Sequence, residues 1–241
     1  MHSGFLRHRF GVLLCMVGAV ILSAAISYNE LDALHAVRLS SEFSRTLVID
    51  PGHGGDDGGA VSTDGIQEAD INLSIGNRLF TLAELCGIPV VRTRDSSQIS
   101  YPKDAQTIAA RKVADQKQRV AFINETPNAI LISIHQNQFP TAQPHGAQVL
   151  YGTVVDSAGF GQMLQEQLIM LLDRENRRVA APISDDIYLT KHVNCPAVLV
   201  ECGFLSNPEE CARLQTDEYQ LQLTLTILSS YLQYYQNGSQ I

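Results

Sequence analysis

The chain has 241 residues and a formal net charge of −8 at pH 7, with 45% apolar and 17% charged residues. This composition is typical of a globular protein and excludes collagen, coiled-coil and intrinsically disordered classes. The 25 acidic residues outnumber the 17 basic ones, which argues against a nucleic-acid-binding protein because such proteins present a basic face.

The N-terminal segment has the pattern of an export signal. Arg7 and Arg9 precede an uncharged, largely apolar run over residues 10–26. The run is slightly long for a cleaved signal and slightly short for a full membrane span. We expect residues 1–27 to be a signal peptide or a membrane anchor, residues 28–44 a linker and residues 45–237 the functional domain. Either form of the segment places that domain outside the cytoplasm, secreted or at the outer face of the membrane.

Short apolar runs alternate with segments of helical periodicity along the rest of the chain. In the first helix, Ile71, Ile75, Leu79 and Leu82 recur on one side, and Gly87 follows the helix end. In chain order the pattern predicts a strand over 46–50, a helix over 68–86, a strand over 88–93, a helix over 107–124, strands over 129–135 and 146–151, a helix over 160–174, strands over 187–190 and 197–202, and a helix over 219–235.

These strands predict a single α/β domain. Apolar strands separated by helices favour a mostly parallel, twisted sheet with helices on both faces. A further helix start is predicted where Asn207 precedes Pro208, since proline is favoured in the first turn. In such sheets functional residues gather at the carboxyl ends of the strands.

Four polar residues are expected at that edge. His53 follows the first strand, Glu68 opens the first long helix, His135 ends the strand over 129–135, and Glu201 lies at the end of an apolar strand. Two histidines and one carboxylate form a zinc site with an open position, which is the catalytic pattern. A fourth carboxylate beside it acts as general base and then general acid. The residues therefore indicate a metal-assisted amide or ester hydrolase.

Other interpretations of these residues stay open. His135 alone is compatible with a satisfied core histidine, and Glu68 with an acid favoured in the first turn of a helix. A phosphate-binding loop is disfavoured, because the glycines after His53 lack the required spacing and Asp56 and Asp57 would repel a phosphate. His145 and His192 are rival ligands; they rank lower because neither ends a strongly apolar strand.

Four cysteines follow the N-terminal segment: Cys86, Cys195, Cys202 and Cys211. An even number outside the cytoplasm permits disulfides, so their pairing stays open. Their spacing matches no zinc ribbon. Cys86 and Cys195 each lie at the edge of an apolar stretch, and we expect both to be buried thiols.

Four motifs in this order resemble the zinc-dependent N-acetylmuramoyl-L-alanine amidases. They are residues 48–55 (VIDPGHGG), Glu68 with 71–73 (INL), 133–137 (SIHQN) and 200–207 (VECGFLSN). The similarity extends over residues 46–235. Within the family the chain is most similar to the CwlD-type spore-cortex amidases, through residues 93–95, 111–112, 119–120 and 187–189.

The resemblance implies that His53, Glu68 and His135 bind one zinc ion and that Glu201 is catalytic. It implies hydrolysis of the amide between the lactyl group of N-acetylmuramic acid and L-alanine in peptidoglycan. In the spore branch this step precedes formation of muramic-δ-lactam by a separate deacetylase. Two other functions stay open: a zinc peptidase acting within the stem peptide, and a non-catalytic peptidoglycan-binding module. An activating partner protein and membrane anchoring through residues 10–26 are further expectations.

The chain departs from the family pattern near two ligands. Ala69 follows Glu68 where the family usually has a basic residue, and Gln136 and Gln138 flank Asn137 where many members have alanine. We expect none of these residues to touch a proposed ligand, and we expect them to alter substrate preference rather than the chemistry.

Overall fold

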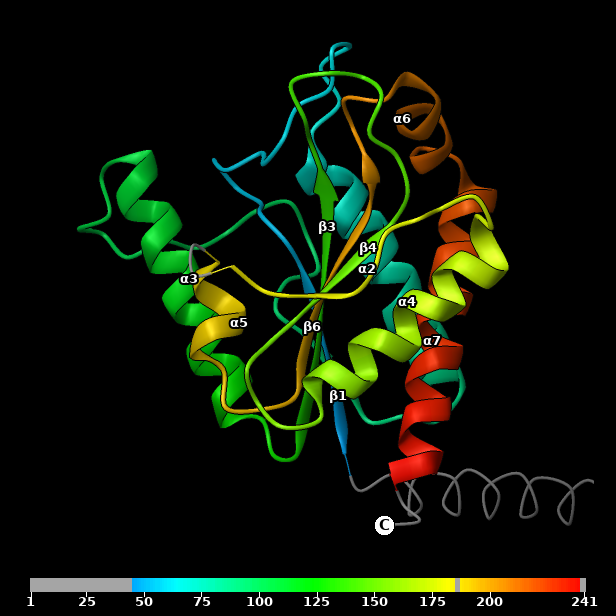
Figure 1. The fold of residues 1–241 in the computed structure, drawn as a ribbon. Coiled ribbons are helices and arrows are strands. Elements are labelled where there is room, and N and C mark those ends of the chain that lie inside the picture. Colours follow the sequence, from blue (N-terminus) through cyan, green and yellow to red (C-terminus); the bar gives the residue numbers. More distant parts are fainter. Residues whose placement is uncertain (1–44, 185–186, 239–241) are drawn as a thin grey trace, which may run out of the picture. The chain divides into compact units, whose positions relative to one another are not determined.

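One sheet runs through the centre of the computed structural model, which describes residues 45–184 and 187–238 (Figure 1). The elements, in chain order, are β1 (Thr46–Pro51), α2 (Glu68–Leu85), β2 (Val90–Arg92), α3 (Ile108–Glu125), β3 (Ala129–Asn137), β4 (Gln148–Tyr151), α4 (Ser157–Leu172), β5 (Ala181–Pro182), α5 (Tyr188–His192), β6 (Ala197–Phe204), α6 (Pro208–Leu214) and α7 (Asp217–Gly238). The single α/β domain predicted from the sequence is confirmed.

The sheet of the described residues has six strands in the order β2-β1-β3-β6-β4-β5. All neighbours are parallel except β4, which runs antiparallel to β6. The central strands β1, β3 and β6 are buried over nearly their whole length. Continuous burial explains why these strands contain runs of consecutive apolar residues, such as 47–49, 129–132 and 197–200, rather than apolar residues in alternate positions. The mostly parallel sheet is therefore as predicted.

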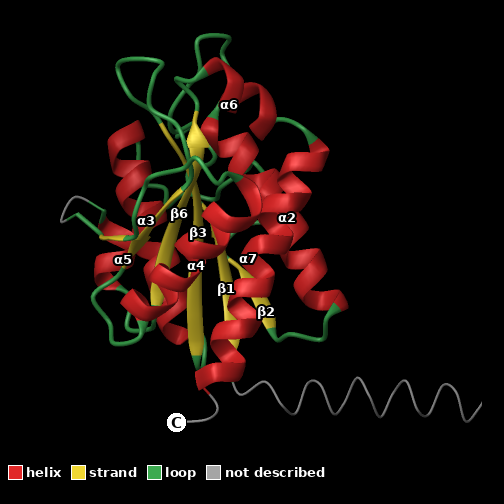
Figure 2. Ribbon diagram, turned by 45° about the vertical axis from the view of Figure 1, so that its right-hand side comes forward, coloured by secondary structure: helices red, strands yellow, loops and turns green. Residues whose placement is uncertain are grey.

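Helices cover both faces of the sheet. α2, α4 and α7 pack together on one face, and α3 and α5 lie on the other (Figure 1). Figure 2, turned by 45°, shows α4 and α7 in front of the central strands and α3 and α5 to one side. On the α3 side the core includes Val48, Ile123, Leu131 and Leu189. This arrangement leaves the carboxyl ends of β1, β3 and β6 at one edge, with α2 and α3 on either side of it.

The strand predicted over 187–190 is wrong. The chain forms the short helix α5 there, because Leu189 and Val193, four residues apart, bury on the same side against the core. Tyr188 and His192 stack at 3.9 Å between ring centroids, again at helical spacing. A segment of five residues is too short for its apolar pattern to distinguish a strand from a helix, and the packing of α5 on α3 decides between them.

Other differences are smaller. α6 begins where predicted, with the Asn207 side chain accepting the N–H groups of Glu209 and Glu210 at 3.0 and 3.2 Å. The two-residue strand β5 has no signal in the sequence. All four cysteines of the described part are free thiols. Cys195 is buried as expected, but Cys86 is exposed at the end of α2, which corrects the prediction.

The N-terminal predictions lie outside the described residues. They concern the signal or anchor over 1–27 and the linker over 28–44. Among the helices that the structure describes, none has the length and apolar character of a membrane span.

Candidate functional site

The loop between β1 and α2 carries the first candidate ligand to the sheet edge. His53 adopts a left-handed backbone conformation, with φ of 58°, directly after the strand. The loop then returns to α2, where the carbonyls of Ala60 and Gly58 accept the N–H groups of Glu68 and Ala69 at 2.9 and 3.1 Å. Those N–H groups lack partners within the helix. The start of α2 is thereby fixed against the loop that carries His53.

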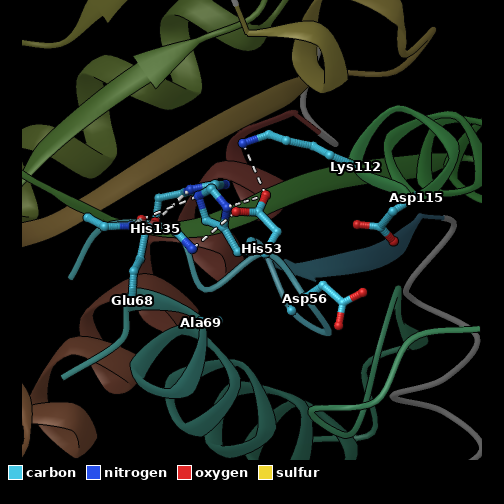
Figure 3. Close-up of polar contacts among 12 residues, drawn as sticks. His53, Asp56, Glu68, Ala69, Lys112, Asp115 and His135 are labelled. Carbon is cyan, nitrogen blue, oxygen red and sulfur yellow. Dashed lines mark hydrogen bonds and ion pairs between the residues drawn. The ribbon is translucent and has the colours of Figure 1, made fainter. Parts of the chain in front are cut away.

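Three of the predicted residues meet at this edge. Glu68 Oε2 lies 3.3 Å from His53 Nε2, and Glu68 Oε1 lies 2.9 Å from His135 Nδ1. The imidazole centroids are 5.0 Å apart, and the rings are edge to face. Figure 3 shows Glu68 and His135 side by side with His53 adjacent to them. The carboxylate thus lies between the two imidazoles.

Glu68 is held in place by main-chain and side-chain donors. Ala60 N–H donates to its Oε2 at 2.8 Å, and Gln136 N–H donates to its Oε1 at 3.0 Å. Asn72, one turn further along α2, donates to Oε1 at 3.2 Å. Burial raises the pKa of Glu68, but the hydrogen bonds from His135 and His53 outweigh it and hold the pKa far below its ordinary value. Glu68 is therefore a carboxylate with a fixed orientation.

The contacts of Gln136 correct one expectation. Its main-chain N–H contacts a candidate ligand directly, and its side chain donates to Asn72 at 3.1 Å inside the core. Gln136 therefore supports Glu68 in two ways: directly through its main-chain N–H, and indirectly through Asn72, which also donates to Glu68 Oε1. The Gln138 side chain instead donates to the Val61 carbonyl at 3.0 Å.

Glu201 lies next to His135 across the sheet. The two residues are direct partners in the register of β3 and β6, so their side chains project from the same face. Glu201 Oε2 is shielded from solvent and has no hydrogen-bond partner among the described residues. Burial raises the pKa of this carboxyl, with His135 opposing that effect. A partly desolvated carboxyl beside two imidazoles is suited to accept and return a proton.

The space between the three side chains fits a small metal ion. Their donor atoms lie within 4.8 Å of one another, and within the described part of the chain no other group of His, Cys, Asp or Glu has this arrangement. A Cβ on Gly59 would lie 2.5 Å from Glu68 Oε2 and 2.7 Å from His53 Cδ2. Gly59 also has φ of 70°, so only glycine leaves this space open without strain. Two imidazoles and a carboxylate are a donor set that zinc accepts.

The rival histidines lie elsewhere. His145 is exposed, and its ring contacts the carbonyl of Gln143. His192 stacks on Tyr188 in α5. Neither belongs to the cluster that could hold a metal ion.

Two buried arginines, which the sequence analysis did not identify as functional, hold the backbone of the His53 loop. Arg119 of α3 donates to the carbonyls of Pro51 at 2.8 Å and His53 at 2.7 Å. Arg94 donates to the carbonyls of Pro51 at 2.8 Å, Gly52 at 3.0 Å and Ala69 at 2.8 Å. The two arginine side chains thus bind the three successive carbonyls of residues 51–53 and the carbonyl of Ala69, which follows Glu68. Their long sequence separation leaves no local signal.

Asp50 balances the charge of Arg119. Its Oδ1 accepts from Arg119 Nη1 at 2.8 Å, and its Oδ2 accepts from the Ser133 hydroxyl at 2.6 Å.

We expect Arg119→Met to lower the free energy of unfolding by roughly 3–5 kcal/mol, because the variant leaves the Asp50 carboxylate buried without its partner. Urea unfolding measures this loss. Arg177→Met, at an exposed pair with Glu175, is the control and should change it by less than about 0.5 kcal/mol.

The same pair predicts an acid dependence of stability. Burial raises the pKa of Asp50, but Arg119, Ser133 and Thr93 outweigh it and hold the pKa at about 2, below the ordinary 3.8. Because the folded-state pKa is the lower one, this stabilisation is present above pH 4 and is lost as the pH falls through about 2. The difference in unfolding free energy between wild type and Asp50→Asn should therefore shrink over that range. A difference that stays constant from pH 6 to pH 2 contradicts the assignment.

Comparison with known proteins adds to this geometry. The family model described as N-acetylmuramoyl-L-alanine amidase matches residues 47–230. The germination-specific N-acetylmuramoyl-L-alanine amidase of Bacillus subtilis (strain 168) is 34% identical over 192 residues, which cover 79% of this chain and 80% of that protein.

Solved structures of amidases are also similar to this chain. The CwlD amidase from Clostridioides difficile, solved in complex with the GerS lipoprotein, is 36% identical with a TM-score of 0.76, covering 79% of this chain and 98% of that one. An N-acetylmuramoyl-L-alanine amidase from Clostridium difficile 630 is 28% identical with a TM-score of 0.68, covering 79% of this chain and 96% of that one.

Proposed function

The chain belongs to the N-acetylmuramoyl-L-alanine amidase family, and we propose that it uses zinc, held by His53, Glu68 and His135, to hydrolyse the amide between the lactyl group of N-acetylmuramic acid and L-alanine. Peptidoglycan is its substrate. The observation that carries the zinc proposal is the cluster of two imidazoles around the Glu68 carboxylate, with Glu201 in register beside His135.

In this proposal each residue of the site has one task. A zinc ion bound by such a donor set lowers the pKa of water toward about 7 and polarises a carbonyl. Glu68 is kept as a carboxylate by its donors, so it is ready to bind a cation. Glu201 accepts the proton of the attacking water and then returns it to the leaving L-alanine nitrogen. Its raised pKa favours the second of these transfers.

We assign the enzyme to maturation of the spore cortex. The support is the similarity to the germination-specific amidase of Bacillus subtilis. Removal of the stem peptide would there supply the muramic acid that a separate deacetylase converts to muramic-δ-lactam.

We also propose the organisation of the whole chain. Residues 1–27 are a signal peptide or membrane anchor, 28–44 a linker and 45–237 the catalytic domain, and the enzyme acts in the cell envelope, where its substrate lies. The similar Clostridioides difficile amidase was solved with a lipoprotein. By analogy we propose that a partner protein activates this chain.

The experiment is a digest of purified peptidoglycan by the full chain solubilised in detergent, with zinc and after chelation. Mass spectrometry and end-group analysis identify the products. The proposal predicts peptides with a new L-alanine amino terminus, released only with zinc. A different amino terminus would identify a stem peptidase. If the chain binds peptidoglycan but releases no peptide, even when the proposed activating partner is added, it is a non-catalytic module.

A further inference from the structure

Two adjacent acidic residues in the His53 loop have different partners. Asp56 pairs with Arg111 of α3. Asp57 pairs with Lys112 of α3, with 3.0 Å between Lys112 Nζ and Asp57 Oδ2. The same Oδ2 lies 3.0 Å from His53 Nδ1. Figure 3 shows Lys112 reaching from α3 toward His53, whereas the Asp56 carboxylate points away from it. Of these two acids, only Asp57 contacts a candidate metal ligand.

The position of Asp57 does not depend on its contact with His53. Gly54 N–H donates to the Asp57 carbonyl at 2.8 Å, and Asp57 N–H donates to the Gly54 carbonyl at 3.1 Å. Its second carboxylate oxygen, Oδ1, accepts from Gly59 N–H at 3.2 Å. Lys112 holds Oδ2 from the other side. The carboxylate is therefore held next to the imidazole by four other contacts.

This placement determines which nitrogen of His53 carries the hydrogen. A carboxylate only accepts hydrogen bonds, so Nδ1 must donate to Asp57. Nε2 faces the Glu68 carboxylate in the same way, so in the metal-free site it also donates a hydrogen. A bound cation would take the place of that hydrogen, and the neutral imidazole would keep its single N–H group on Nδ1 and offer the Nε2 lone pair to the cation. Nε2 is the nitrogen that lies 3.3 Å from Glu68 Oε2, on the side of the cluster. Asp57 thus occupies Nδ1 of His53, and Nε2 is left pointing toward the place where a metal would be bound.

We propose that Asp57 is a positioning residue that fixes the tautomer and the ring orientation of His53 for zinc binding. The proposal rests on the proposed function, because it assumes that His53 is a zinc ligand. Removal of such a partner from a metal-binding histidine typically weakens metal binding by about 10–100-fold. We expect a loss of this size when the carboxylate is replaced.

The matched variants are Asp57→Asn and Asp56→Asn. Both remove one negative charge from the same loop without changing the size of the side chain. In Asp57→Asn the amide N–H is able to donate to His53 Nδ1, which favours the tautomer with hydrogen on Nε2. Asp56→Asn leaves every contact of His53 in place. Zinc affinity, measured for the full chain in detergent by competition with a chromogenic chelator, should fall by about 10–100-fold only in Asp57→Asn.

A second measurement separates positioning from general loosening of the loop. Nitrogen-15 spectra of the histidine rings in the zinc-saturated wild type should show Nε2 of His53 as the coordinating nitrogen and Nδ1 as protonated. Coordination through Nδ1 would overturn the proposal, since Asp57 would then have no hydrogen to accept. Circular dichroism of the metal-free variants checks that both are folded.

The outcomes distinguish this proposal from the proposed function. Equal zinc affinities of Asp57→Asn and Asp56→Asn, in a chain whose wild type binds one zinc ion, would overturn the role of Asp57 alone. A wild type that binds no zinc would overturn the proposed zinc site, and the positioning role with it. A selective loss in Asp57→Asn supports both.

Discussion

Glu201→Gln should lower the rate of peptidoglycan amide hydrolysis by about 10²–10⁴-fold while zinc content and fold stay unchanged. Gln has the size of Glu but neither accepts nor returns a proton in this reaction. Glu201 Oε2 has no hydrogen-bond partner among the described residues, so the substitution breaks no hydrogen bond of that atom. The rate of release of L-alanine amino termini measures the effect.

The control for this variant is Glu209→Gln. Glu209 is exposed at the start of α6 and takes no part in the cluster. It should retain the wild-type rate. Near-wild-type activity of Glu201→Gln would remove Glu201 from the mechanism, whereas loss of zinc in that variant would make it a ligand instead.

His135→Ala should abolish stoichiometric zinc binding and, with it, the activity. The imidazole is one of three donors, and Glu68 Oε1 lies 2.9 Å from its Nδ1. Two remaining donors cannot complete the ligand set of a catalytic zinc site. Atomic absorption after dialysis measures the metal content.

His145→Ala is the matched control for the loss of an imidazole. His145 was a rival ligand in the sequence, and the structure has it exposed with its ring on a main-chain carbonyl. This variant should keep one zinc ion per chain. Unchanged zinc in His135→Ala, or loss of zinc in His145→Ala, would contradict the proposed ligand set.

The sequence alone predicted the part of the fold that depends on long apolar runs. The strands over 46–50, 129–135 and 197–202 are so continuously apolar that only a sheet buried on both faces accommodates them. Short segments were not predictable in the same way. α5 and β5 have five and two residues, and their conformation is decided by what they pack against.

The site was predictable to the extent that topology determines it. His53 follows β1, Glu68 is the first residue of α2, and His135 and Glu201 lie near the carboxyl ends of β3 and β6, which the structure extends beyond both residues, to Asn137 and Phe204. The carboxyl ends of these parallel strands lie at the same edge of the sheet. Their identification as candidates therefore needed no contact information. The supporting residues are different, because Arg119 reaches His53 over a separation of 66 residues. Asp57 had a local signal, an acid four residues after a histidine, but the spacing alone does not show that the loop folds the two side chains together.

The most direct test of the account is anomalous diffraction at the zinc edge from crystals of the protein grown with zinc. The account predicts one strong peak about 2.0–2.2 Å from His53 Nε2, His135 Nδ1 and a carboxylate oxygen of Glu68, with Glu201 close by but not coordinating. A peak at other residues, such as His145 or Cys202, or a fully occupied site that uses Glu201 in place of one of the three, would contradict it.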